Sequence, residues 1–187
     1  SIALCESISN IARDIGAINT LIPAQKGNWI GDNTDIIGFL NPLKNKIWEN
    51  RNALILGCGG SARSVFAGLK ILKFKEITIV SRNKVKLNKF IEEMKENLYS
   101  SNIFTPKVNG ILQEDINLIE HIKNSDLIIN TTPIGMSTNT YELKVPLGNE
   151  IWSSLQTNTT LYDLIYTPKP TKWLKIGAKM NCQIIDG

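Results

Sequence analysis

The stretch Asn52-Ala-Leu-Ile-Leu-Gly-Cys-Gly-Gly-Ser-Ala62 decides the fold of this 187-residue chain. Its first five residues form an apolar run that predicts a buried strand, and residues 57–73 predict a glycine-rich turn followed by a helix. A second apolar run at 77–80 predicts the next strand. Strand, glycine turn, helix and strand in this order are typical of the first unit of a dinucleotide-binding domain.

The small residues of the turn have separate roles. Gly57 would make the tight turn, Gly59 would let a pyrophosphate approach the backbone, and Ala62 would pack the helix against the sheet. Backbone N–H groups and the helix dipole would then bind phosphate. The candidate residues of this turn are Gly57, Cys58, Gly59, Gly60 and Ser61. A purely structural turn is the alternative, and the periodicity of both flanks favours binding.

The end of the second strand indicates which dinucleotide binds. An NAD site usually has Asp or Glu about 20 residues beyond the glycines, whereas a 2′-phosphate favours Arg there. Residues 77–90 contain no Asp or Glu, and Arg82 follows the strand, between Ser81 and Asn83. The Arg82 guanidinium can hold a phosphate with two hydrogen bonds, and Lys86 can add charge. We therefore expect NADP, with Lys89 on the solvated face of the next helix.

Strands and helices continue to alternate along the chain. The pattern predicts helices over 84–99, 114–124 and 171–180, and strands near 103–108 and over 127–130, 160–165 and 183–185. This alternation predicts an α/β fold with a doubly wound parallel sheet, a Rossmann-like domain.

The residues before Asn50 do not follow that rhythm. They predict a helix over 2–15, a short strand over 17–22, a turn at 26–28 and a helix over 36–48. We therefore expect residues 1–31 to be a remnant, the tail of another domain, and residues 32–187 to be the nucleotide-binding domain with its linking helix.

Composition excludes several classes of function. The net charge of +4 is modest and the lysines are not interleaved with aromatic residues, so we expect no nucleic acid partner. The apolar runs are too short for a membrane helix, so we expect no membrane partner. Three cysteines without CxxC spacing and a single histidine, His121, indicate no disulfide framework and no metal site. These features favour a cytoplasmic location.

Four further motifs occur in a fixed order along the chain. They are Gly16-Ala-Ile-Asn-Thr20, Gly31-Asp-Asn-Thr-Asp35, Asn130-Thr-Thr-Pro-Ile-Gly-Met136 and Asp163-Leu-Ile-Tyr166. Together with the glycine turn and Ser81-Arg-Asn83, they resemble the shikimate dehydrogenase family over essentially the whole chain. The resemblance implies reduction of 3-dehydroshikimate to shikimate with NADPH, in aromatic amino-acid and chorismate biosynthesis, between two α/β domains.

The resemblance also implies roles for individual residues. Asn19 and Tyr166 would bind substrate, and Asp35 would bind substrate and exchange the hydroxyl proton together with a lysine of the N-terminal domain. The Thr132 loop would lie along the cofactor, and Leu164 and Gly187 would border the nicotinamide. In this resemblance the lysine precedes Ser1 and further residues follow Gly187. We therefore expect this chain to be a fragment that lacks most of its substrate domain, binds NADPH weakly and is inactive alone.

Plainer interpretations of three of these residues stay open. Asp35 precedes a helix and could be an N-cap, Asn19 could belong to an ordinary turn, and Tyr166 could close a strand with its ring in the core. Three other functions also stay open: an NAD-using quinate/shikimate dehydrogenase, a non-catalytic dinucleotide-binding module, and one domain of a fused multifunctional enzyme.

Overall fold

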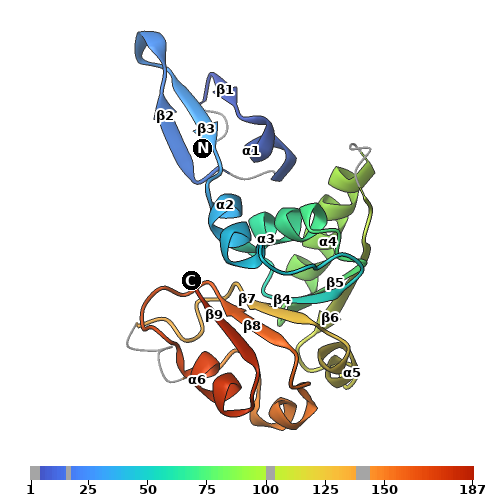
Figure 1. Ribbon diagram of the computed structural model, residues 1–187. Coiled ribbons are helices and arrows are strands. Elements are labelled where there is room, and N and C mark those ends of the chain that lie inside the picture. The colour runs from blue at the N-terminus through green and yellow to red at the C-terminus, as the bar shows by residue number, and fades with distance from the viewer. Residues whose placement is uncertain (1–4, 16–17, 100–103, 138–143) are drawn as a thin grey trace.

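The computed structural model describes residues 5–15, 18–99, 104–137 and 144–187. Within these residues, six parallel strands form one sheet in the order β6-β5-β4-β7-β8-β9 (Figure 1). They are β4 (Asn52–Leu56), β5 (Glu76–Ser81), β6 (Lys107–Leu112), β7 (Leu127–Asn130), β8 (Thr160–Asp163) and β9 (Gln183–Asp186). The order reverses between β4 and β7, so the predicted doubly wound sheet is confirmed.

Helices cover both faces of the sheet, as Figure 1 shows. The hydrophobic contacts divide them into two layers. The first layer contains α3 (Gly60–Ile71) and α4 (Lys84–Tyr99), and the second contains α5 (Leu118–Lys123), the 3-10 helix η4 (Asn149–Ser154) and α6 (Lys172–Lys179).

Each layer encloses its own hydrophobic core. Ile55 of β4 packs into the first core, and its neighbour Leu54 packs into the second. A strand buried on both faces has a continuous apolar sequence, which is why β4 was recognisable. Trp48 is buried in the first core and Trp173 in the second.

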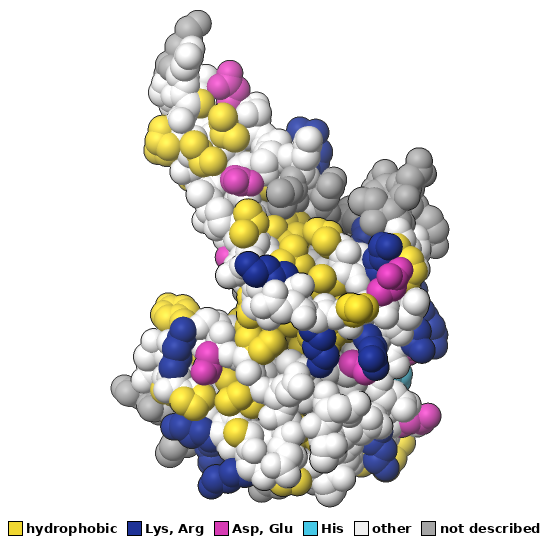
Figure 2. All heavy atoms as spheres, in the orientation of Figure 1, with side chains coloured by type: hydrophobic (Ala, Val, Ile, Leu, Met, Phe, Trp, Pro, Cys, Tyr) yellow, Lys and Arg dark blue, Asp and Glu magenta, His cyan; other side chains and the backbone are white. Residues whose placement is uncertain are grey.

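A smaller unit precedes the large sheet and projects away from it (Figure 1). Its described elements are β1 (Ser7–Ile8), α1 (Asn10–Ile15), β2 (Thr20–Pro23), the 3-10 helix η2 (Gln25–Gly27) and β3 (Trp29–Asp32). The strands pair in the order β1-β3-β2. Leu21, Ile22 and Trp29 are exposed, and hydrophobic side chains gather on this unit in Figure 2. The described residues of the unit leave this apolar surface uncovered.

A short linker connects the two units through α2 (Asp35–Leu40) and the 3-10 helix η3 (Asn41–Leu43). Helix α2 packs on α3 at Gly68, where a Cβ atom would lie 2.6 Å from Cδ1 of Phe39. The close approach therefore requires glycine at this position. The helix predicted over 36–48 is an α-helix only to Leu40 and a 3-10 turn to Leu43, because Pro42 lacks the N–H group that would continue the α-helix.

Other predictions in irregular regions are corrected as well. The described part of the helix expected over 2–15 is reduced to α1, because Ser7 and Ile8 instead pair with β3. The strand expected near 103–108 is β6, at 107–112, and the helix expected over 114–124 begins at Leu118. Strand β3 was not predicted at all.

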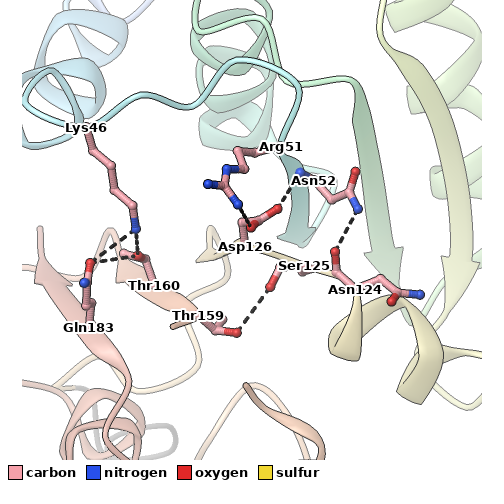
Figure 3. Close-up of polar contacts among 9 residues, drawn as sticks. All are labelled: Lys46, Arg51, Asn52, Asn124, Ser125, Asp126, Thr159, Thr160 and Gln183. Atoms are coloured by element: carbon pink, nitrogen blue, oxygen red, sulfur yellow. Dashed lines mark hydrogen bonds and ion pairs between the residues drawn. The ribbon is translucent and has the colours of Figure 1, made fainter. Parts of the chain in front are cut away.

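Polar contacts hold the amino ends of the strands to one another and to the end of the linker, residues 44–51 (Figure 3). Arg51 Nη1 donates to Asp126 Oδ1 at 3.0 Å, and the backbone N–H of Asn52 donates to Asp126 Oδ2, with 2.9 Å between N and O. Asn52 Nδ2 also donates to the carbonyl of Asn124 at 2.8 Å. Asp126, the residue before β7, thus joins that strand to the start of β4.

Lys46 fastens the linker to the next two strands. Its Nζ donates to Thr160 Oγ1 of β8 and to Gln183 Oε1 of β9, both at 3.3 Å (Figure 3). Burial lowers the pKa of Lys46, and the nearby Arg51 lowers it further. The linker is therefore held across the amino edge, opposite the edge where strands of such sheets bind ligands.

We expect Asp126→Ala to lower the free energy of unfolding by about 1–2 kcal/mol, because it leaves the half-buried Asn52 N–H without its acceptor. Arg51→Ala removes the other half of the exposed ion pair and should cost less than about 1 kcal/mol. Urea unfolding followed by circular dichroism compares the two variants. An equal loss in both would mean that the ion pair, and not the backbone hydrogen bond, gives Asp126 its effect.

Candidate functional site

A cavity of about 620 Å³ lies where the strand order reverses, at the carboxyl edge of the sheet. Parallel sheets of this type bind ligands at that position. The cavity is lined by Leu56, Gly57, Cys58, Gly59, Val80, Ser81, Arg82, Asn83, Lys86, Gln113, Thr131, Thr132, Pro133, Ile134 and Pro146. The fold therefore brings the glycine turn, the basic segment after β5 and the Thr132 loop together.

The glycine turn has the geometry that a close-bound phosphate requires. Gly57 has a φ of +106°, and its N–H donates to the carbonyl of Val80 at 2.8 Å. A Cβ atom at Gly57 would lie 2.8 Å from Thr131 Oγ1. At Gly59, a Cβ atom would have no atom within 4 Å, so the backbone there faces open space. Helix α3 begins at the next residue and points its first N–H groups toward this space.

The segment after β5 is shaped by hydrogen bonds of short side chains. The Cys58 thiol donates to Ser81 Oγ at 3.3 Å, and Ser81 Oγ accepts from the Asn83 N–H at 3.2 Å. Asn83 Oδ1 accepts from the Lys86 N–H at 2.9 Å, which caps the start of α4. Arg82 and Lys86 are exposed at the cavity, and among its described lining residues no side chain is acidic. The site is therefore electropositive.

The loop after β7 is held by the side chain of Asn130, which is fully buried. Asn130 Oδ1 accepts from the Thr132 N–H at 3.0 Å and from Thr132 Oγ1 at 2.7 Å. Thr131 Oγ1 donates to the carbonyl of Leu56 at 2.7 Å, which joins this loop to the end of β4. Thr131 and Thr132 thus form the wall of the cavity opposite Arg82.

Asp163 is the centre of a second buried network. The side chain is 0% exposed, at the carboxyl end of β8. Burial raises the pKa of its carboxyl to about 6, against the opposing effect of hydrogen bonds from Thr171, Ile165 and Asn130, and the carboxylate of Asp186 contributes to the rise. This acid therefore changes its charge near neutral pH.

Asp35 and Asn19 meet at the start of α2, outside the cavity. Asn19 Nδ2 donates to Asp35 Oδ1 at 2.5 Å, and Asn19 Oδ1 accepts from the Thr34 N–H at 3.0 Å. Asn33, which is buried, accepts the Asp35 N–H at 3.1 Å and a hydrogen bond from Ser64 of α3 at 3.2 Å. Asn33 thus fixes the Asp35 backbone to α3, while the carboxylate stays exposed.

The remaining candidates lie along the same edge of the sheet. Tyr166 is 70% exposed, so its ring is not in the core. A Cβ atom at Gly187 would lie 2.6 Å from the backbone of Leu164, so these two residues are adjacent. Neither they nor Gly60 and Ser61 line the cavity itself.

Gln113 and Pro146 are cavity residues that the sequence did not reveal, and Ile134 lies within the motif of residues 130–136 but was not singled out there. Gln113 Nε2 donates to the carbonyl of Pro146 at 3.2 Å. Gln113 follows β6 directly, so placing that strand at 107–112 would have found it. Proline and isoleucine in loops carry no comparable signal.

Within the described residues, no helix has both the length and the apolar character needed to cross a membrane. The same residues contain no group of three or more His, Cys, Asp or Glu side chains arranged to hold a metal ion.

The chain is 46% identical to a protein of Prochlorococcus marinus (strain MIT 9515) named shikimate dehydrogenase (NADP(+)). The match extends over 184 residues, which are 98% of this chain and 62% of that protein. The chain is homologous to part of the shikimate dehydrogenases. It spans about 62% of the length of these curated relatives. No family model matches it.

Solved shikimate dehydrogenases have the same fold. A crystal structure in complex with NADP⁺ matches with a TM-score of 0.79 and 30% identity, over 100% of this chain and 61% of the other. The enzyme of Listeria monocytogenes, in complex with shikimate and NAD, matches with a TM-score of 0.81 and 25% identity, over 98% and 62%. The resemblance inferred from the sequence motifs is therefore confirmed.

Proposed function

We propose that the protein containing this chain is a shikimate dehydrogenase that reversibly reduces 3-dehydroshikimate to shikimate with NADPH. The observation that carries the proposal is the cavity in which the glycine turn faces Arg82 and Lys86. A phosphate of the dinucleotide fits the open backbone at Gly59, and the 2′-phosphate fits the cationic side chains. The absence of an acid among the described lining residues favours NADP over NAD.

In this proposal the cofactor lies across the carboxyl edge of the sheet. The pyrophosphate binds the turn of residues 57–61, and Ser81, Arg82, Asn83 and Lys86 bind the adenosine end. The Thr132 loop contacts the middle of the cofactor, and Leu164 and Gly187 border its nicotinamide. These positions follow the carboxyl ends of β4, β5, β7, β8 and β9 in turn.

Bound NADPH supplies the hydride. Asn19, Asp35 and Tyr166 orient the substrate, and Asp35 moves the proton at the hydroxyl oxygen together with a lysine from the substrate domain. The hydrogen bond from Asn19 orients the exposed Asp35 carboxylate. A carboxylate fixed in this way can serve as one member of an acid–base pair.

We propose that residues 1–31 are the tail of the substrate domain, and that residues 32–187 bind NADP. β3 ends at Asp32, next to this boundary. The exposed apolar side chains of β2 and β3 support the proposal that they pack against the rest of the substrate domain in the same protein. We also propose small molecules rather than nucleic acid as ligands. The described cysteines, Cys5, Cys58 and Cys182, form no disulfide bond with one another, which supports a cytoplasmic location.

The test is the discrimination between NADPH and NADH. We expect Arg82→Ala to weaken NADPH binding about 10-fold or more, because a hydrogen bond to a charged group contributes about 1.5–3 kcal/mol. NADH lacks the 2′-phosphate, so its affinity should change little. Isothermal titration calorimetry of both cofactors with this chain measures the two effects.

Lys89→Ala is the matched control, because Lys89 lies on the same helix as Lys86 but outside the cavity and near Glu93. Its affinity for NADPH should equal that of the unmodified chain. Equal losses of NADPH and NADH in Arg82→Ala would remove Arg82 from the phosphate site. Absence of 3-dehydroshikimate reduction by the protein that contains this chain would refute the proposed activity.

A further inference from the structure

We propose that Asp163 is a positioning residue. Its fully buried carboxylate holds residues 131–134, the cofactor loop, in register with residues 164–166, the substrate turn. The proposal rests on the proposed function, because it concerns the same site. It starts from the complete burial of a carboxyl group among loops that contain the candidate residues Thr132, Leu164 and Tyr166.

Three donors from three segments converge on the Asp163 carboxylate. Oδ1 accepts from Asn130 Nδ2 at 3.0 Å and from the Ile165 N–H at 3.2 Å. Oδ2 accepts from Thr171 Oγ1 at 2.8 Å. The carboxylate therefore joins the end of β7, the turn after β8 and the start of α6.

Each donor is itself part of a functional loop or its support. Asn130 uses Oδ1 to hold both the N–H and the hydroxyl of Thr132, and its Nδ2 also donates to the carbonyl of Ile134 at 3.1 Å. The Ile165 N–H lies between Leu164 and Tyr166 in the chain. The cofactor loop and the substrate turn are thus linked through one carboxylate.

The third donor anchors this arrangement to the second layer. Thr171 is the N-cap of α6, and its Oγ1 accepts from the Leu174 N–H at 3.4 Å. Leu174 is fully buried, so α6 is fixed to the sheet. A displacement of the Asp163 carboxylate would therefore shift the positions of Thr132 and Tyr166, while α6 stays packed in the core.

The chemistry of the position supports a role beyond packing. Aspartate is almost never fully buried unless it is paired, and an apolar residue would avoid the cost of burying a charge. Asp163 faces the neutral groups of Asn130 on β7 and Thr171 at α6, and the carboxylate of Asp186 on β9. A carboxylate can accept from all three donors at once, whereas an amide would point an N–H group at one of them and a protonated acid would add an O–H group that needs its own acceptor.

The pH dependence has a definite sign. The pKa of Asp163 is raised to about 6 from 3.8, so the contribution of this group to folding is greatest below pH 4 and is lost as the pH rises to 6. The ionised form costs stability but makes the three hydrogen bonds. We therefore expect the ordering of the loops, and with it kcat, to increase as the pH rises through 6.

The experiment compares Asp163→Ala with Thr160→Val in the protein that contains this chain. Thr160 is buried at the other end of β8 and contacts only groups of the amino edge among its described hydrogen bonds. We expect Asp163→Ala to lower kcat about 10- to 100-fold, since a displacement of about 1 Å can have this effect. The dissociation constant for NADPH should change little, because Arg82 and the glycine turn remain. Thr160→Val should change neither quantity.

Asp163→Asn keeps the shape and should retain more activity than Asp163→Ala. It should also lose the rise in kcat near pH 6 that the unmodified protein has. If Asp163→Ala keeps its kcat, or if Asp163→Asn keeps the rise near pH 6, the proposal is overturned. An unmodified protein that does not oxidise shikimate with NADP⁺ would refute the proposed function instead.

Amide hydrogen exchange tests the positioning independently of activity. If Asp163→Ala does not fold, Asp163→Asn replaces it in this measurement. Exchange at Thr132, Ile134 and Tyr166 should be faster than in Thr160→Val. Equal exchange in the two variants would refute the positioning role whether or not the enzyme turns over shikimate.

Discussion

Replacing Asp35 with asparagine is expected to lower kcat for shikimate oxidation by about 10²- to 10⁴-fold, the usual contribution of a general acid–base group. Asparagine has the shape of aspartate and can still accept the hydrogen bond from Asn19 through its amide oxygen. The Asp35 backbone N–H would also keep its hydrogen bond to Asn33. The substitution therefore removes the capacity to take a proton and leaves the local structure in place.

Steady-state kinetics at several substrate concentrations separates this effect from binding. The loss should appear in kcat, with a smaller change in KM. Asp32→Asn is the control, because Asp32 lies three residues earlier and its carboxylate accepts from Ser9 Oγ and the Asn33 N–H. It should keep the kcat of the unmodified protein. Nearly full activity of Asp35→Asn would leave this carboxylate with only its hydrogen bond from Asn19 in the first turn of α2.

Gly57→Ala is expected to weaken NADPH binding about 100-fold, which corresponds to about 2.7 kcal/mol. The φ of +106° is a conformation that residues with a side chain rarely adopt. The new methyl group would also lie 2.8 Å from Thr131 Oγ1 and 3.0 Å from Thr132 Cγ2. The glycine turn and the wall formed by Thr131 and Thr132 would have to move apart, so the phosphate site and the Thr132 loop would be disturbed together.

Gly38→Ala provides the comparison within the same chain. Gly38 lies in α2, and a Cβ atom there would have no atom within 4 Å. Alanine should therefore stabilise the chain by about 0.5–1 kcal/mol without changing its affinity for NADPH. Calorimetric titration and thermal unfolding of both variants give the two readings. Normal NADPH affinity in Gly57→Ala would place the cofactor away from the turn.

The parts of the site that were predictable from the sequence depend on local geometry. The strand of residues 52–56 is buried on both faces and therefore apolar throughout, and Gly57 follows it where a positive φ is needed. Arg82 was recognisable because it directly follows the second strand. In each case, residues adjacent in the sequence determine the local structure, so the sequence pattern alone predicts it.

The parts that were missed depend on contacts distant in sequence. Ser7 and Ile8 are extended because they pair with residues 30 and 31, against the helical spacing of their own segment. β6 contains Asn109 and Gly110, which break an apolar pattern, and Asn109 instead donates to Glu76 of the neighbouring strand at 2.6 Å. Placing this strand too early also hid Gln113.

Asp163 illustrates the same limit within the site. The sequence placed it in a motif with Tyr166, within the strand predicted over 160–165, and gave no prediction of its burial. Its burial results from Asn130 and Thr171, which lie 33 and 8 residues away. Only the folded sheet brings these donors together, so no local sequence pattern could have predicted that the Asp163 carboxylate is buried and hydrogen-bonded.

The enclosure of Trp48 on one side of the sheet and Trp173 on the other gives each helical layer its own natural fluorophore. Versions of the chain that keep either Trp48 or Trp173 as the only one of its four tryptophans would report separately on the loss of each layer during denaturation. Coincident emission changes would identify a single cooperative transition, and separated changes would reveal which layer outlasts the other.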